Sequence, residues 1–172
     1  NNWENKKVDI NNNFTFPEDK PTQIYIVDKP GATQSVIFMG HKSNKYDVDG
    51  PFFTSKIMNY PLGGGASGRL FLNLREDKGY TYGVYSFFNG DQDKGSFMVF
   101  SSVKTQATDS ALTEILFEIE NYIENGISDE ELRSTKSSML NSDALKYESP
   151  MKKMSFLNKM LKYNLDKSYI TK

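Results

Sequence analysis

Residues 62–83 read LGGGASGRLFLNLREDKGYTYG, and the rest of the chain is organised around this stretch. Three glycines precede Ser67, a residue type favoured at helix N-caps, and apolar side chains follow it at helical spacing. Gly79 tolerates the positive φ that is common just past a helix end, and the aromatic and β-branched residues after it favour a strand. The stretch therefore predicts a glycine loop, a short helix and a strand.

Two side chains with hydrogen-bonding chemistry stand on either side of the helix end. Arg75 lies in the last turn of the predicted helix and Tyr82 early in the strand, so a guanidinium and a phenol could face one cleft. The alternative is that Arg75 pairs with a neighbouring carboxylate at the surface and that Tyr82 fills a strand face, because most arginines at helix ends are solvated. In a regular strand Tyr85 points away from Tyr82, whereas Tyr80 shares its face.

The chain before this stretch predicts an arm, a hairpin and a helix. Residues 1–20 are rich in Asn, Lys and acidic side chains and are predicted to form a linker or an N-terminal arm, with 21–172 forming a single domain. Two apolar runs, 23–28 and 34–41, predict an antiparallel hairpin around a Lys-Pro-Gly turn. Helical spacing predicts a helix over 51–60.

The chain after this stretch predicts a second hairpin and three helices. Residues 80–88 and 96–103 alternate around a polar, glycine-containing turn. Helices are predicted over 107–124, from the capping box that begins at Ser128, and from Pro150 onward. The seam of the last helix is expected to consist of Met154, Leu157, Met160 and Leu161. The predicted fold class is α+β, a mainly antiparallel sheet with helices packed on one face.

Size, charge and composition limit the partners. A chain of 172 residues with 37% hydrophobic content can bury one sizeable core. A formal charge of −1 gives no case for binding nucleic acid or an anionic membrane surface, and no apolar run approaches the roughly 20 residues of a membrane span. Because the chain begins at Asn1 and shows no signal segment, we expect an excised domain or a processed chain.

The residues for a hydrolytic metal site are not present. Such a zinc site needs three protein ligands, usually His and carboxylate, whereas His41 is the one histidine and cysteine is absent. We therefore predict no metal site in this chain and a surface or capping role for His41. Gly63, Gly64 and Gly65 lack the Lys-Ser/Thr of a phosphate-binding loop, and a sharp bend that lets another chain approach closely explains them better.

The central stretch resembles the C-terminal, non-metal-binding type of domain in the M16 family of zinc peptidases (insulinase, pitrilysin and mitochondrial processing peptidase). The resemblance extends from about residue 23 to residue 140, and Gly68 and Tyr80 depart from the serine and leucine that are usual there. The matching residues are Leu62, Gly63, Gly64, Gly65, Ser67, Arg69, Leu70, Phe71, Leu74, Arg75, Glu76, Gly79, Tyr82 and Val84.

The resemblance implies a function shared between two domains. This chain would be the substrate-binding, transition-state-assisting half of a zinc metallopeptidase, inactive without a homologous zinc-bearing domain upstream in the same polypeptide or on another subunit. Arg75 and Tyr82 would hydrogen-bond an extended peptide substrate and hold the oxygen that becomes anionic during hydrolysis, beside the loop formed by Gly63, Gly64 and Gly65. For a bacterial protein, the resemblance implies a periplasmic or exported location.

Two other functions remain open from the sequence. The first is a non-catalytic structural module, as in respiratory-complex core subunits that resemble this family. The second is a free-standing peptide-binding domain, in which residues 23–28 or the edge of the second hairpin take an added peptide strand.

Overall fold

The computed structural model describes residues 18–144 and 147–170, which fall into two compact units. The first unit comprises residues 1–31 and the second residues 32–172. In the first unit, residues 18–29 form neither helix nor strand, and Ile24, Tyr25, Ile26 and Val27 are exposed. The predicted strand over 23–28, and with it the first hairpin, is therefore wrong. A run of apolar residues forms a strand only where a neighbouring strand takes up its backbone hydrogen bonds, and this run has no ladder partner in the described residues.

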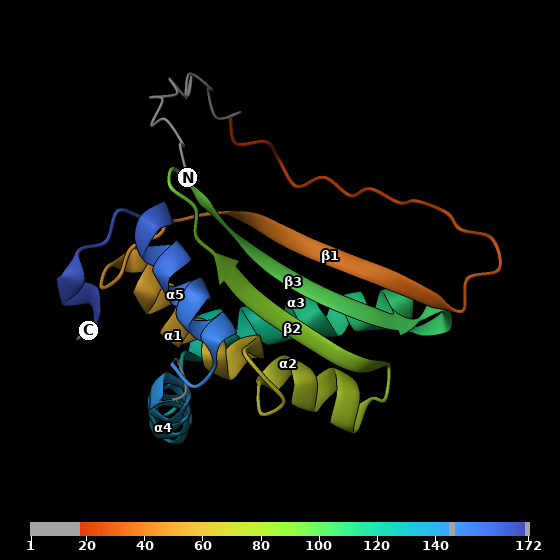
Figure 1. The fold of residues 1–172 in the computed structure, drawn as a ribbon. Coiled ribbons are helices and arrows are strands. Elements are labelled where there is room, and N and C mark those ends of the chain that lie inside the picture. Colours follow the sequence, from red (N-terminus) through yellow and green to blue (C-terminus); the bar gives the residue numbers. More distant parts are fainter. Residues whose placement is uncertain (1–17, 145–146, 171–172) are drawn as a thin grey trace. The chain divides into compact units, whose positions relative to one another are not determined.

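The second unit is built on an antiparallel sheet of order β1-β3-β2 (Figure 1). Strand β1 spans Gln34–Ser43, β2 spans Thr81–Asn89 and β3 spans Gly95–Lys104. The β2–β3 hairpin confirms the second predicted hairpin to within about one residue at each end. Side chains in register share a face, so the row Ile37, Ser101 and Val84 is buried on the inner face.

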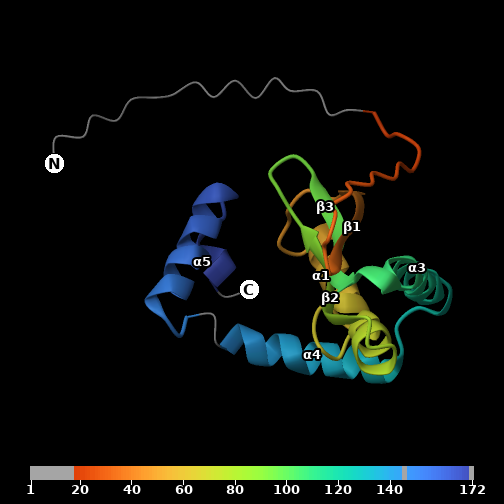
Figure 2. The same ribbon diagram turned by 90° about the vertical axis from the view of Figure 1, so that its right-hand side faces the viewer.

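Helices cover this inner face. Helix α1 spans Pro51–Gly63, α2 Arg69–Phe71 and the π-helix η1 Leu72–Asp77, and α3 spans Thr108–Asn125 after the short 3-10 turn η2 (Thr105–Ala107). In Figure 1, α3 lies behind β2 and β3, and the edge view of Figure 2 shows it on one side of the sheet. The core joins side chains of these helices to the inner side of the strands: Ile37, Leu62, Leu70, Leu74, Val84, Phe97, Val99, Val103, Ala111, Ile115 and Tyr122. This arrangement confirms the predicted α+β class.

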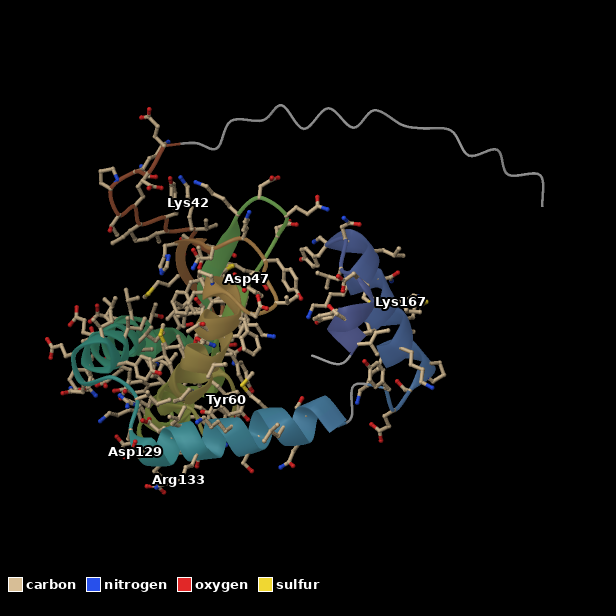
Figure 3. The ribbon with its side chains drawn as sticks, turned by 90° about the vertical axis from the view of Figure 1, so that its left-hand side faces the viewer. Lys42, Asp47, Tyr60, Asp129, Arg133 and Lys167 are labelled. Atoms are coloured by element: carbon tan, nitrogen blue, oxygen red, sulfur yellow. The ribbon has the colours of Figure 1, made fainter. Side chains whose placement is uncertain are left out.

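The start of α1 is fixed by Asp47, which is labelled in Figure 3. Its carboxylate accepts hydrogen bonds from the backbone N–H groups of Gly50, Phe52 and Phe53 at 2.7, 2.9 and 3.1 Å. Burial raises the pKa of Asp47, but the three backbone donors outweigh it and hold the pKa below its ordinary value. Helix α1 runs past the predicted end at residue 60 and includes Pro61 in its last turn.

Helix α4 spans Asp129–Ala144, α5 spans Pro150–Lys162 and the 3-10 turn η3 spans Lys167–Ile170. The cap predicted at Ser128 is confirmed, because the N–H of Glu131 donates to Ser128 Oγ at 3.2 Å. At the start of α5, the N–H of Lys152 donates to Ser149 Oγ at 3.3 Å. No helix among the described residues combines the length and apolar character that a membrane crossing requires.

The predicted seam of α5 is wrong. Met154, Leu157 and Leu161 are exposed and Met160 is half-buried, and the contact with the turn after β2 is made instead by Tyr163, just past the end of α5. The ring of Tyr163 stacks on Tyr46 with 3.8 Å between centroids, and its hydroxyl donates to the carbonyl of Gly90 at 2.9 Å. Aromatic stacking here outweighs the aliphatic stripe that helical spacing favoured.

Candidate functional site

A β-bulge at the start of β2 shapes the corner that the sequence singled out. Thr81 is opposite Val103 and Val84 is opposite Ser101, so two residues of β2 are opposite the single Ser102 of β3. The Thr81 hydroxyl lies 2.6 Å from the carbonyl of Ser102, and that of Ser101 donates to the carbonyl of Gly83 at 3.1 Å. These buried hydroxyl groups form hydrogen bonds with backbone carbonyl groups near the bulge, where the ladder between the strands is interrupted.

The bulge turns Tyr82 to the outer face of the sheet. Thr81 and Val84 both point into the core although they are three residues apart, and Tyr82 between them is 83% exposed. The isolated Gly83 was the signal for this bulge, since a glycine inside a strand pattern is typical of one. The strand is therefore not regular, and Tyr85, predicted to point away from Tyr82, lies on the same outer face.

Arg75 is positioned by the π-helix. The N–H of Lys78 donates to the carbonyl of Asn73 at 2.9 Å, and that of Tyr80 donates to the carbonyl of Leu74 at 2.9 Å. Gly79 between them has φ +63°, which confirms its predicted place just beyond the helix end. Leu74 is fully buried, and its neighbour Arg75 is thereby presented at the side of the helix beside β2. π-Helical turns are rare and are frequent at functional sites.

The two predicted site residues lie together. The guanidinium carbon of Arg75 stands over the ring of Tyr82, 5.7 Å from its centroid. Asp77 pairs with Lys78 at 2.9 Å, and in the described part of the chain no carboxylate forms an ion pair with Arg75. The alternative in which Arg75 pairs with a neighbouring carboxylate at the surface is therefore not supported by the geometry. Among the described residues, no hydrogen bond engages the guanidinium of Arg75 or the hydroxyl of Tyr82, so the donors of both side chains remain available to a ligand.

The three glycines have different surroundings. A side chain at Gly63 would have its Cβ 2.7 Å from the backbone nitrogen of Ser86, and one at Gly64 would meet the Cα of Tyr60 at 2.7 Å. A side chain at Gly65 would meet nothing within 4 Å. The chain that approaches closely at Gly63 is thus β2 of the same domain, where Asn59 and Ser86 exchange hydrogen bonds of 2.6 and 2.7 Å. The cap predicted at Ser67 is wrong, because Gly68 is the N-cap of α2.

The described residues contain no group of three or more His, Cys, Asp or Glu side chains that could hold a metal ion. His41 lies on β1, exposed, with its Nδ1 2.7 Å from the carbonyl oxygen of Lys42. The chemistry of the corner is therefore that of hydrogen-bond donors: it can bind a carbonyl or an anionic oxygen.

Comparisons with known proteins place this geometry in a family. The family model described as the peptidase M16 inactive domain matches residues 1–139. The chain belongs to the M16 peptidase family, as an inactive domain. The M16 inactive domain is also similar, at 28% identity and a TM-score of 0.71, to the crystal structure of a peptidase M16 inactive domain from Pseudomonas fluorescens, covering 81% of this chain and 33% of that one.

Two curated relatives of this M16 inactive domain have contrasting names. One is the "Uncharacterized zinc protease YmxG" of Bacillus subtilis, 33% identical over 58% of this chain and 24% of the relative. The other is the "Non-peptidase homolog YmxG" of Helicobacter pylori, 29% identical over 67% of this chain and 27% of the relative. The chain thus spans about a quarter of the length of these relatives.

A second arginine of the M16 inactive domain, Arg69, acts as an anchor that the sequence analysis did not identify. Its guanidinium donates to both carboxylate oxygens of Glu131 at 2.6 and 2.8 Å and to the carbonyl of Gly126 at 2.9 Å. It also lies over the ring of Tyr122 at 4.7 Å, and the Tyr122 hydroxyl donates to the carbonyl of Met58 at 2.5 Å. The capping box was a partial signal, because Glu131 serves both the cap and Arg69.

This anchor shifts the titration of Glu131. The hydrogen bonds from Arg69 lower its pKa to about 2, against the opposing effect of burial and with further help from Ser128. Arg69 thereby ties the start of α2 to the turn between α3 and α4. The helical segment that carries Arg75 is thus fixed to the α3–α4 turn through Arg69, and this contact does not involve Arg75 itself.

Proposed function

We propose that this domain is the substrate-binding, transition-state-assisting half of an M16 zinc metallopeptidase, inactive without a homologous zinc-bearing domain. The observation that carries the proposal is the juxtaposition of Arg75 and Tyr82 on the outer face, 5.7 Å apart, with no carboxylate among the described residues pairing with Arg75. Zinc in the homologous domain would supply the Lewis-acid and nucleophile chemistry that this chain lacks.

The role of Arg75 and Tyr82 follows from the charge that hydrolysis creates. Addition of a nucleophile to a peptide carbonyl leaves negative charge on the carbonyl oxygen, and preorganised donors that face this oxygen stabilise it. The guanidinium supplies charge and a planar fork, and the phenol supplies one O–H donor. Because Tyr82 lies on the sheet face opposite the buried core, a second domain would reach it, with Arg75 beside it, from the outer side of the sheet. Closure of the two domains would then be a condition of catalysis.

The glycine segment has a secondary place in this proposal. Gly63 and Gly64 are required by packing against β2 and within α1, whereas Gly65 is open and can approach a peptide without steric conflict. We therefore assign peptide contact chiefly to Gly65, with Gly63 and Gly64 shaping the loop that presents it.

The test uses the complete protein together with its zinc-bearing domain. Arg75→Ala is expected to lower kcat/KM for an unstructured peptide by about 10²- to 10³-fold, the range measured for loss of one oxyanion donor, and Tyr82→Phe by a smaller factor. Tyr80→Phe is the matched control, because it removes a phenol from the same strand entry at a position packed against the core. Unchanged turnover in both Arg75→Ala and Tyr82→Phe contradicts the proposal.

A structural module without catalysis is the second candidate, favoured by the relative named as a non-peptidase homolog. It predicts that the complete protein cleaves no peptide even when zinc is supplied in stoichiometric amount. Measuring zinc content and peptide cleavage on the same preparation separates the two functions.

A further inference from the structure

The sheet has apolar side chains on its outer face as well as on its inner one. Phe38, Phe100 and Tyr85 are paired across all three strands, and the rings of Phe38 and Phe100 lie 5.0 Å apart. Phe38 is 64% exposed and Val36, on the same strand, 60% exposed. An antiparallel sheet that faces water on one side normally alternates apolar and polar residues, so this aromatic row is unusual for a solvent-facing surface.

The aromatic row is continuous with the corner of Arg75 and Tyr82. A Cβ at Gly83 would lie 3.0 Å from the Tyr85 ring, so this ring folds back over the bulge toward Tyr82. Tyr85 also lies 6.4 Å from Phe71, measured between ring centroids. The bulge that exposes Tyr82 therefore also joins it to the row. Tyr82 and Tyr85 are three residues apart on one strand, a separation that about three residues of an extended peptide would match.

The charged side chains at the outward positions of the three strands have one sign. The outward positions of the three strands carry no carboxylate: they are Gln34, Val36, Phe38, Gly40 and Lys42 on β1, Ser96, Met98, Phe100, Ser102 and Lys104 on β3, and Tyr82, Tyr85, Phe87 and Asn89 on β2. Lys104 lies at the Arg75 end of the sheet, since its N–H donates to the carbonyl of Tyr80 at 3.0 Å. A ligand that combines apolar side chains with negative charge complements this surface.

We propose that the outer face formed by Phe38, Phe100 and Tyr85 is a subsite for an aromatic or large aliphatic side chain of an extended, acidic peptide. The peptide residue that carries this side chain lies about three positions along the peptide from the bond that Arg75 and Tyr82 hold. The inference rests on the proposed function for the position of that bond. A peptide is favoured over a packing helix because the row ends at two donors that need an oxygen ligand and because the flanking charge is cationic.

The experiment measures binding and cleavage separately on the complete protein. Two fluorescent peptides are compared, both with Glu residues near one end and differing only by Phe or Ser at the third position from the cleaved bond. We expect the wild-type protein to bind the Phe peptide about tenfold more tightly, a ratio that partial burial of one ring supports. Phe38→Thr is expected to remove this preference while leaving the affinity for the Ser peptide unchanged.

The control variant is Phe117→Gln, which removes an exposed phenylalanine from α3, on the other side of the sheet. It is expected to keep the tenfold preference. Phe38 lies on an edge strand, and threonine is chosen there because a β-branched residue favours a strand. Met98→Thr provides a second test on the central strand.

Each outcome decides one of the two proposals. Equal binding of the two peptides by the wild-type protein overturns the subsite. A loss of domain assembly in Phe38→Thr and Met98→Thr, with the peptide preference intact in whatever assembles, also overturns it, because the face then packs against the partner domain. Preferential binding without any cleavage supports the subsite and contradicts the catalytic function instead.

Discussion

Arg69 and Arg75 lie six residues apart on one helical segment and have opposite surroundings. Arg69 makes two bonds to Glu131 and one to the carbonyl of Gly126, and it stacks on Tyr122. Arg75 stands over Tyr82 and has no ion pair within the described ranges. An arginine that donates three hydrogen bonds within its own domain holds structure together, whereas one that makes none there has its donors left for a ligand.

The change from α2 to η1 accounts for part of this difference. Leu70 and Leu74 are both fully buried, so the segment keeps one side against the core. Arg69 precedes the first of these leucines and reaches toward the helical layer, and Arg75 follows the second and lies beside the strand. The widened π turn between them alters the angular spacing along the segment. Two arginines of one short motif can therefore have different roles, one in the fold and the other in the site.

The largest expected effect on stability is at Arg69. Arg69→Ala removes both bonds to Glu131 and leaves a partly buried carboxylate without its main partner, which we expect to lower the free energy of unfolding by about 3 kcal/mol. Urea denaturation of the chain measures this change. Arg75→Ala is the matched control and is expected to change the free energy of unfolding by less than about 0.5 kcal/mol. Equal losses in the free energy of unfolding of the two variants would contradict the assignment of Arg69 to a structural role and Arg75 to a ligand-facing one.

The next largest effect on stability is expected at the glycines, where Gly63 is packed and Gly65 is open. Gly63→Ala places a methyl group against Ser86 and against the Leu70 side chain, so we expect a loss of about 2 kcal/mol. Gly65→Ala meets nothing within 4 Å and is expected to leave stability unchanged or slightly increased. Comparing the urea midpoints of the two variants tests this, and a similar loss at both positions contradicts the assignment of Gly63 to packing and Gly65 to the open side.

The smallest effect concerns the pH dependence of the anchor. Because the pKa of Glu131 is lowered to about 2 in the folded chain, its contribution to stability is present above its ordinary pKa of 4.5 and is lost as pH falls toward 2. Glu131→Gln should therefore be less stable than the wild type at pH 7, by about 1 kcal/mol after allowance for solvent screening, with the gap closing below about pH 4. Denaturation curves between pH 2 and pH 7 measure the gap; a constant gap shows that the charge of Glu131 is not what the bridge depends on.

Helix caps, turns and other secondary structure that depends on nearby residues could be predicted from the sequence alone. The capping boxes, the glycine with positive φ at residue 79, the β2–β3 hairpin and the amphipathic helix at 108–125 follow from neighbours a few residues apart. The pairing of Arg75 with Tyr82 was also within reach, because only one short turn separates the two residues.

The tertiary structure decided what depends on partners distant along the chain. Residues 23–28 have the pattern of a strand, but no strand in the described part of the chain pairs with them. The aliphatic stripe of α5 is left largely exposed, and Tyr163, just past the helix, makes the packing contact instead. The bulge at Gly83 depends on hydroxyl groups from two strands, and only it places Tyr82 and Tyr85 on one face. The pairing that separates Arg69 from Arg75 comes from Glu131 and Tyr122, more than fifty residues beyond Arg69, which local spacing does not encode.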